Sequence, residues 1–376
     1  MIYLDNSATT QVMPVTAQAI YNSLTANYFN PSALYTPAMH VEKEMTNARE
    51  CLLKALNARQ YEVIFVSGGT EANNLAINGL LTGKKSGRVL YTAGEHPSVK
   101  QACLQQKNII AQEIPLQNDG RVDLAKLEAM LADDVAMLCI MQVNNETGAV
   151  MQLSEIMSLK KRLCNQAFVH VDGVQGFLRE PLELQSLGID SYTLSGHKIH
   201  APKGIGALVL RKGSPLTPCM IGGGQERNLR SGTENVSGII GLQNAVVNFP
   251  KSDIRLVKIH LFEQLKERIP SIYVNGPSPY DNASAPHILN VSFTPVRSET
   301  LLHALAGDEV YVGVGSACSS HKQKTSPVLK AMHTAPHVAE SAIRFSLNPY
   351  ITKEEVEKAA SLVQKHYEIL KKYVRK

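Results

Sequence analysis

The hydrophobic positions of the chain switch repeatedly between helical and strand spacing. Apolar residues recur every three or four positions over Pro14–Leu24 and Met39–Leu56, which predicts two helices. Short apolar runs then predict buried strands at Glu62–Val66, Arg88–Thr92, Val135–Val143, Phe168–Asp172, Ser191–Ser195 and Ile205–Leu210. Helices are expected to begin at Thr70 or Glu71 and to span Ser154–Cys164. This alternation predicts an α/β fold whose central sheet is mostly parallel with helices on both faces, and we expect Ile205–Leu210 to close the sheet.

The pattern changes after Asn248-Phe249-Pro250, where we place a domain junction. The elements predicted beyond it are a helix over Ile254–Ile269, strands around Ile272–Val274 and Ile288–Phe293, a helix over Ser298–Ala306, a strand over Val310–Val314, a strand around Arg344, and a helix over Thr352–Lys376. A chain of 376 residues exceeds one ordinary core. We therefore expect a large α/β domain over 12–249 and a smaller α+β domain over 250–376, with residues 1–11 packing on the smaller one.

Composition excludes several function classes. The chain is 44% hydrophobic and 19% charged, with a formal net charge of +5 and no long basic run, so neither nucleic acid nor a membrane surface is implied as a partner. The longest apolar run, near Val135–Val143, is far shorter than the ~20 residues of a membrane span. Met1 leads directly into YLDNSATT without a basic and then apolar leader, so we expect a cytoplasmic protein. Six scattered cysteines without C-x-x-C pairs argue against a zinc site and against a disulfide framework.

The stretch from His170 to Pro202 contains the most informative chemistry. It predicts two buried strands, one ending in Asp172, with Gln175 one turn later, and the other ending in Ser195, with Lys198 in the next turn. Ligands bind at the carboxyl ends of strands in open α/β sheets. A lysine could hold pyridoxal phosphate as a Schiff base, while the carboxylate keeps the pyridine nitrogen protonated. Ser195 and His197 could bind the phosphate; alternatively, Asp172 is a helix cap and the lysine is solvated.

Three further strand ends place polar groups at the same edge of the predicted sheet. The glycine turn SGGTEANN precedes a helix whose free N–H groups could bind an anion, although an ordinary turn with Thr70 as the N-cap residue explains it equally well. His96 follows the second strand and could stack on a ring or carry protons, or simply lie at the surface. Asn145 follows the strand at Val135–Val143.

Cys318 differs from the other cysteines in its setting. It lies in a predicted loop, after GSA and before SSHKQK, where His321 and Lys322 could lower the pKa of the thiol. An exposed free thiol is otherwise disfavoured in soluble proteins. We therefore expect Cys318 to be a nucleophile.

Arg344 lies on a predicted apolar strand, AIRFSL, where a charge is costly unless it is paired. A buried carboxylate of the protein would satisfy it. A substrate carboxylate would do so equally well, because the guanidinium binds carboxylates in a bidentate fork.

These motifs together resemble those of a known family. SGGTEANN, EHPSV, VNNETG, HVDGVQ, SGHK, GGGQERNLRSGTEN and GSACSS occur in the order found in the cysteine desulfurases. Those enzymes belong to the aminotransferase class V branch of the fold-type-I pyridoxal phosphate enzymes. The resemblance extends from YLDNSATT to the strand around Arg344, which is almost the whole chain.

The resemblance implies a role for each matching residue. The residues that match phosphate ligands are Gly69, Thr70, Ser195, Gly196 and His197, and Thr233 matches a residue that reaches the phosphate of the other subunit of an obligate homodimer. The remaining cofactor contacts match His96 on the ring, Asn145 and Gln175 at its phenolic oxygen, Asp172 at the pyridine nitrogen and Lys198 as the Schiff-base lysine. Arg344 matches the residue that binds the substrate carboxylate, and Cys318 the one that carries a persulfide.

The implied reaction is removal of sulfur from L-cysteine, giving L-alanine and a persulfide on Cys318 that passes to an acceptor protein. That acceptor could serve iron–sulfur cluster assembly, tRNA thiolation or another thio-cofactor pathway. A selenocysteine lyase, or another class V enzyme, would share Lys198 and Asp172 without needing Cys318. A non-enzymatic scaffold in a sulfur-delivery complex would be expected to lose these residues, and they are all present.

The chain also departs from the family pattern in three places. Asn30-Pro31-Ser32 lacks the usual preceding glycine, Tyr35 stands where a histidine is common, and Asn348-Pro349 replaces the usual Gly-Arg. These positions lie outside the expected cofactor contacts. They affect the expected acceptor preference and substrate geometry, and not the class of reaction.

Overall fold

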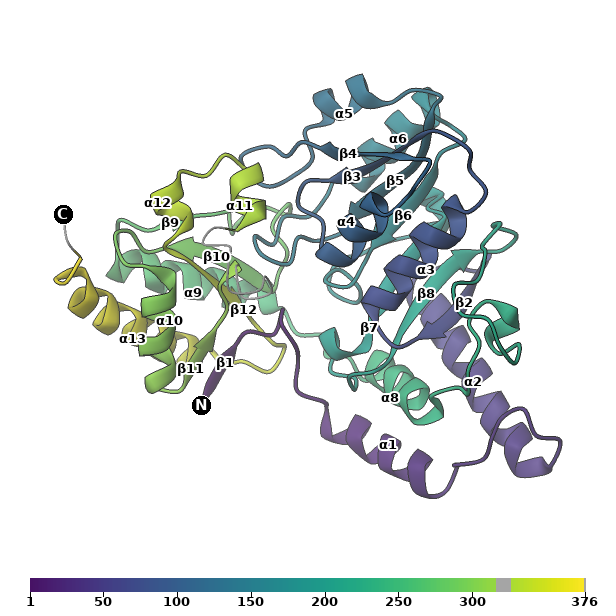
Figure 1. The fold of residues 1–376 in the computed structure, drawn as a ribbon. Coiled ribbons are helices and arrows are strands. Elements are labelled where there is room, and N and C mark those ends of the chain that lie inside the picture. Colours follow the sequence, from purple (N-terminus) through teal and green to yellow (C-terminus); the bar gives the residue numbers. More distant parts are fainter. Residues whose placement is uncertain (316–325, 375–376) are drawn as a thin grey trace.

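The computed structural model describes residues 1–315 and 326–374 and has two bodies, each with its own sheet (Figure 1). The larger body is built on a seven-stranded sheet in the order β2-β8-β7-β6-β5-β3-β4. Its strands are β2 (Tyr61–Val66), β3 (Arg88–Thr92), β4 (Ile110–Ile114), β5 (Val135–Met141), β6 (Phe168–Asp172), β7 (Ser191–Ser195) and β8 (Gly206–Arg211). Strands β3 to β7 are mutually parallel, and only β8 runs antiparallel to its neighbours β7 and β2.

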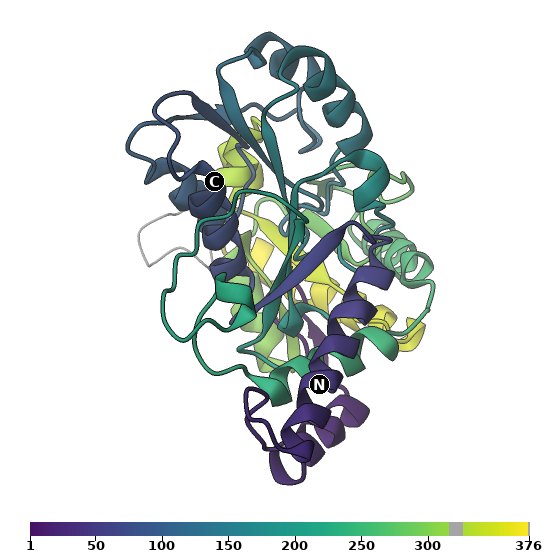
Figure 2. The same cartoon turned by 90° about the vertical axis from the view of Figure 1, so that its right-hand side faces the viewer.

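Helices cover both faces of this sheet. They are α1 (Pro14–Thr25), α2 (Thr36–Ala55), α3 (Gly69–Leu81), α4 (Pro97–Leu104), α5 (Leu124–Met130), α6 (Leu153–Leu163), α7 (Leu184–Leu187) and α8 (Val236–Val247). Leu138 and Ile140 of β5 join the apolar cluster under α2, α5, α6 and α8, whereas Met137 and Cys139 join the cluster under α3 and α4. Figure 2, seen from the side of β2, shows α2 and β2 in front of the rest of the sheet. Because both faces of β5 are covered, the strand reads as one continuous apolar run.

The strand predictions in this body were largely confirmed. β6 and β7 have the predicted bounds, and α3 begins one residue before the prediction, with Gly68 as its N-cap residue. The expectation that Ile205–Leu210 closes the sheet was wrong, because β8 lies inside the sheet between β7 and β2. The connection from β7 to β8 is too short for a crossover, so the chain turns back beside β7. The sequence analysis missed the edge strand β4, whose IAQEI lacks a long apolar run.

The smaller body contains an antiparallel sheet in the order β12-β10-β9 and a parallel pair of β1 with β11. Its strands are β1 (Ile2–Leu4), β9 (Tyr273–Val274), β10 (Ile288–Ser292), β11 (Val310–Val312) and β12 (Ala342–Ser346). Its helices are α9 (Ile254–Arg268), α10 (Ser298–Gly307), α11 (Pro327–Ala331), α12 (Pro336–Ala339) and α13 (Lys353–Lys371). A capping box between Thr352 and Glu355 begins α13. In the part of the chain that the structure describes, no helix is long and apolar enough to cross a membrane.

Separate apolar cores distinguish the two bodies. One cluster joins Ile2 and Leu4 of β1 to α9, β10, α10, β11, β12 and α13, while the clusters of the large sheet draw on residues between Met13 and Ala245. We therefore propose that the domains are 12–249 and 250–376, with residues 1–11 belonging structurally to the smaller domain.

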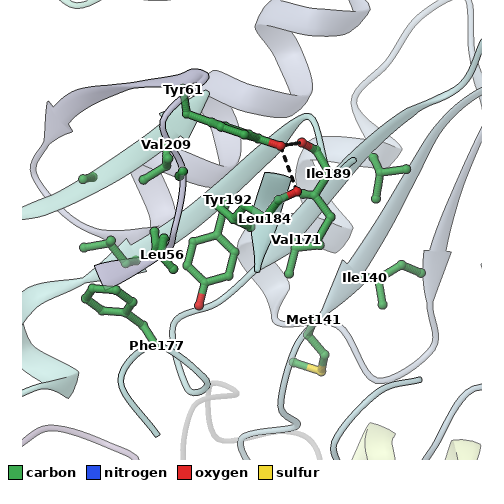
Figure 3. Close-up of a cluster of buried hydrophobic side chains, with 14 of the residues drawn as sticks. Leu56, Tyr61, Ile140, Met141, Val171, Phe177, Leu184, Ile189, Tyr192 and Val209 are labelled. Carbon is green, nitrogen blue, oxygen red and sulfur yellow. Dashed lines mark hydrogen bonds between the residues drawn. The ribbon is translucent and has the colours of Figure 1, made fainter. Parts of the chain in front are cut away.

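Two buried tyrosines pack in the core of the large sheet, Tyr61 beside the amino end of β7 and Tyr192 beside the carboxyl end of β6. The Tyr61 hydroxyl donates to the carbonyls of Leu184 and Ile189, and the Tyr192 ring lies beside Phe177 (Figure 3). Gly173, directly after β6, packs so closely on Tyr192 that an added Cβ would lie 1.8 Å from the ring atom Cζ. Only a residue without a side chain fits here, and this close contact sets the direction of the turn that follows β6.

We expect Gly173→Ala to lower the free energy of unfolding by about 1–3 kcal/mol, because the added methyl must displace a buried ring. Urea denaturation measures this difference. Gly307→Ala is the matched control, since a Cβ added there meets no heavy atom within 4 Å. Equal stability of the two variants would contradict the assigned contact.

Candidate active site

The parallel strands bring the predicted polar residues to one edge of the large sheet. Five strand ends contribute in turn: β2 precedes Thr70, β3 precedes His96, β5 precedes Asn145, β6 ends at Asp172, and β7 leads into the short 3₁₀ turn η1 (Gly196–Lys198). Burial has the largest effect on the pKa of His96 and lowers it. The charge of Asp172 raises this pKa, and the charge of Lys198 lowers it. These three groups therefore lie within electrostatic reach of one another.

The N-terminal segment closes this edge from the side of the smaller body. Lys198 Nζ donates to the carbonyl of Ser7 at 2.5 Å and to that of Ala8 at 2.8 Å. Gln175 Nε2 also donates to Ser7 O, at 3.0 Å. Thr9 Oγ1 lies 3.2 Å from Nδ1 of His197. From the sequence, residues 1–11 were expected only to pack on the smaller domain, because nothing local in them indicates contact with positions almost two hundred residues away.

An open pocket of about 340 Å³ lies at the start of α3. Its walls include the turn from Ser67 to Glu71 together with Ala8, Thr9, Ser195, His197, Lys203 and Gly204. The first N–H groups of a helix have no intrahelical acceptors, and together with the helix dipole they favour an anion. Val174 lies 2.8 Å from the position of an added Cβ at Gly69, so only glycine leaves this turn its present packing. The pocket therefore has backbone donors and one cationic side chain, Lys203, that could bind an anion.

Two of the predicted phosphate ligands differ in their surroundings. Burial, reinforced by the charges of Lys198 and Lys203, lowers the pKa of His197 to about 4, so its imidazole is neutral on the pocket wall. Gly196 is absent from the pocket wall, and its N–H donates to Ile205 O at 3.0 Å. The geometry thus gives Gly196 a role in the turn that presents Ser195 and His197.

Asp172 is buried at the end of β6 and accepts two hydrogen bonds. Its Oδ1 accepts from the Val174 N–H at 3.0 Å, and its Oδ2 accepts from Asn73 Nδ2 at 2.8 Å. The helix-cap alternative is not realised, because no helix begins directly after β6. Asn73 was not predicted from the sequence, and its only signal is its position in α3, one turn after the first residue of that helix.

Arg344 on β12 is buried and already has a carboxylate beside it. Its Nη2 donates to Asp5 Oδ1 at 2.6 Å and its Nη1 to the Asn145 carbonyl at 3.0 Å. Its Nε is buried and has no hydrogen-bond partner among the described residues. Asp5 is thus a protein carboxylate that pairs with Arg344, the first of the two alternatives expected from the sequence.

Glu146 is a second residue that the sequence analysis missed. It is buried below Arg344, and its Oε2 accepts from Ser326 Oγ at 2.5 Å. A Cβ added at Gly315 would lie 2.2 Å from the same oxygen, so Glu146 touches both residues that flank positions 316–325. Cys318 lies within those positions and therefore outside the described residues.

The exposed Thr233 lies in the loop between η2 (Glu226–Asn228) and α8. It is not part of the pocket wall at α3. The loop is fixed to the start of that helix by Arg230, whose Nε donates to Glu71 Oε1 at 2.8 Å. Within this chain Thr233 is therefore held near the pocket without reaching into it.

The fold and these residues match a known family over nearly the whole chain. The model of the aminotransferase class-V family matches residues 2–359. The chain belongs to this family. Membership confirms the resemblance seen in the sequence and implies dependence on pyridoxal phosphate.

Curated relatives and solved structures agree with this assignment. A cysteine desulfurase of Nostoc sp. is 37% identical over 381 residues, covering 99% of this chain and 94% of that protein. A cysteine desulfurase IscS of Dictyoglomus turgidum is 34% identical, covering 98% and 95%. A solved NifS-like protein has a TM-score of 0.88 at 31% identity, covering 98% of this chain and 99% of its own. A solved complex of SspA with cysteine has a TM-score of 0.83 at 28% identity, covering 94% and 100%. These neighbours confirm the expected fold-type-I architecture.

Glu146 makes the stability of the protein depend on pH. Burial raises the pKa of its carboxyl from 4.5 to about 7, although the Ser326 hydroxyl and Arg344 oppose the shift. Between those pH values the unfolded chain loses this proton while the folded chain keeps it. The contribution of Glu146 to stability is therefore full below pH 4.5 and declines as pH rises towards 7.

We expect Glu146→Gln to remove this decline, because glutamine resembles the protonated acid at every pH. The free energy of unfolding of the variant, relative to the unmodified protein, should rise by roughly 2–3 kcal/mol between pH 5 and pH 8. Urea denaturation at both pH values measures it, with the exposed Glu155→Gln as control. A difference that is the same at both pH values would contradict the shift.

Proposed function

We propose that this protein is a cysteine desulfurase that uses pyridoxal phosphate. It takes L-cysteine and the thiol of Cys318 and yields L-alanine and a persulfide on Cys318, so that one sulfur atom moves and all other atoms balance. The observation that carries the proposal is the grouping of Lys198, Asp172 and His96 beside the anion pocket of α3. Cysteine desulfurases that align over almost the full length of the chain support the choice of substrate.

The residues present fit the cofactor. The α3 turn with Gly69 and Thr70, together with Ser195 and His197, would hold the phosphate. Asp172 would meet the pyridine nitrogen, with its carboxylate kept in place by Asn73 and Val174. His96 would lie against the ring, and Asn145 and Gln175 would supply donors to the phenolic oxygen. When bound, the cofactor supplies an electron sink that stabilises negative charge on the substrate Cα.

Lys198 is the residue we assign to hold the cofactor by its amine and to move the proton of the substrate Cα. Its Nζ is oriented by the carbonyls of Ser7 and Ala8. Lysine readily changes protonation state when its surroundings are desolvated, which suits a general base. Cys318 would act as a thiolate on the substrate sulfur.

Arg344 would bind the substrate carboxylate. Its Nη2 is oriented by Asp5, while its buried Nε has no partner among the described residues. A solved relative with the same fold, SspA, is in complex with cysteine, which supports an amino acid as the ligand of this protein.

The protein would act as a homodimer and pass sulfur to an acceptor protein. Thr233, held close to the α3 pocket by the Arg230–Glu71 pair, would reach the phosphate of the partner subunit. Light scattering checks this assembly, and a monomeric mass for the loaded enzyme would remove Thr233 from the site.

The first test is formation of L-alanine from L-cysteine by the protein loaded with pyridoxal phosphate, with a thiol reductant to discharge the persulfide. Lys198→Ala should abolish turnover. Cys318→Ala should keep the bound cofactor and lose alanine formation, whereas Cys219→Ala, at an exposed cysteine, should remain active. Undiminished activity of Cys318→Ala on L-cysteine would remove that thiol from the reaction. Activity of the same variant on selenocysteine alone would indicate a selenocysteine lyase.

A second prediction concerns Arg344. Lysine keeps the charge but loses the fork that binds a carboxylate at two points. We expect Arg344→Lys to raise the KM for L-cysteine by about 10–100-fold, the loss of one or two charged hydrogen bonds. Arg297→Lys, at an exposed arginine paired with Glu340, is the control. An unchanged KM in Arg344→Lys would leave the ion pair with Asp5 as the whole role of this arginine.

A further inference from the structure

A continuous row of buried hydrogen bonds lies behind Asp172 and His96. Ser191 Oγ lies 2.9 Å from His170 Nδ1, and His170 Nε2 lies 3.0 Å from Asn73 Oδ1. The amide nitrogen of Asn73 donates to Asp172 Oδ2 at 2.8 Å and to Ser98 Oγ at 2.9 Å. Ser98 Oγ in turn lies 2.8 Å from His96 Nδ1. The residues of this row behind Asp172 and His96 are all buried: Ser191, His170, Asn73 and Ser98.

The chemistry of Asn73 sets the direction of every bond in this row. A carboxylate only accepts hydrogen bonds, so the amide nitrogen of Asn73 must face Asp172 and the amide oxygen must face His170. His170 must then carry its proton on Nε2, and its Nδ1 accepts from the Ser191 hydroxyl. Burial lowers the pKa of His170 to about 3, which agrees with a neutral ring.

The same direction continues to His96. Ser98 Oγ accepts a hydrogen bond from Asn73, so its own hydroxyl proton is left to donate. The adjacent acceptor is His96 Nδ1. The Ser98 backbone N–H donates to that nitrogen as well, at 3.2 Å. Nδ1 therefore carries no proton in the neutral ring, which leaves the proton on Nε2.

We propose that Ser98, Asn73 and His170 act as positioning residues that hold His96 neutral with its proton on Nε2. His96 is then a fixed hydrogen-bond donor and not a proton acceptor, and proton transfer at the substrate falls to Lys198. This assignment of roles rests on the proposed function, whereas the tautomer itself does not.

Protonating His96 would disrupt two contacts at once. A proton on Nδ1 would displace the Ser98 N–H and force the Ser98 hydroxyl to turn away. The charged groups facing the imidazole are Asp172 on β6, which favours the protonated ring, and Lys198 after β7, which opposes it. Burial outweighs the attraction of Asp172 and lowers the pKa of His96, in agreement with the tautomer that the geometry requires.

The direct test is ¹⁵N NMR of the histidine side chains in the full-length protein without cofactor, with His96 assigned by the loss of its signals in His96→Gln. We expect a neutral ring with the proton on Nε2 from pH 6.5 to pH 9. A proton on Nδ1, or a doubly protonated ring in that range, would overturn the proposal. Because no substrate or cofactor is present, this result is independent of whether the protein is a desulfurase.

A substitution at Ser98 then tests whether this row of hydrogen bonds holds His96 neutral. Ser98→Ala should raise the pH at which His96 titrates and shift the pH profile of kcat for alanine formation in the loaded enzyme, with KM for L-cysteine changed less than twofold. Ser154→Ala is the matched control, because Ser154 is the exposed second residue of α6 as Ser98 is the second residue of α4. An unaltered His96 titration in a folded Ser98→Ala protein would remove Ser98 from this role. If Ser98→Ala does not fold, the NMR result on the unmodified protein still decides the proposal.

Discussion

The requirement that each buried polar group find a partner governs the edge of the sheet where β2, β3, β5, β6 and β7 end. Asp172, Gln175 and Arg344 are buried there, so an unpaired donor or acceptor among them would cost ~1–3 kcal/mol. Asp172 is satisfied by Asn73 and Val174, and Gln175 by the carbonyl of Ser7. Arg344 is satisfied in part by Asp5 and Asn145. Arg344 Nε is a buried donor that has no partner among the described residues.

The N-terminal segment is the element that joins the two bodies at the site. β1 pairs with β11 of the smaller body, and the following residues reach the large sheet through Ser7, Ala8 and Thr9. Asp5 meanwhile holds Arg344 of β12. The positions of the lysine and the arginine are therefore linked through a few residues of the N-terminal segment.

His170 and His197 are held in place by hydrogen bonds and carry no charge. Burial keeps His170 and His197 neutral near pH 7, so each contributes direction and no charge. Lys198 and Arg344 then supply positive charge to the site, balanced by Asp172 and Asp5.

The fold class, the bounds of β6 and β7, and the set of polar strand ends from Thr70 to Lys198 could be predicted from the sequence, because strand spacing and parallel direction follow from local pattern. The sequence did not reveal that β8 lies inside the sheet or that IAQEI forms the edge strand β4, since the order of strands depends on packing between distant segments. Only the tertiary structure joined Asp5 to Arg344, Ser7 to Lys198 and Gln175, and Glu146 to Ser326. Likewise, Asn73 and His170 are ordinary helix and strand residues until folding places them behind Asp172. Hydrogen bonds between residues far apart in the chain leave no periodic trace, so these partners could be identified only in three dimensions.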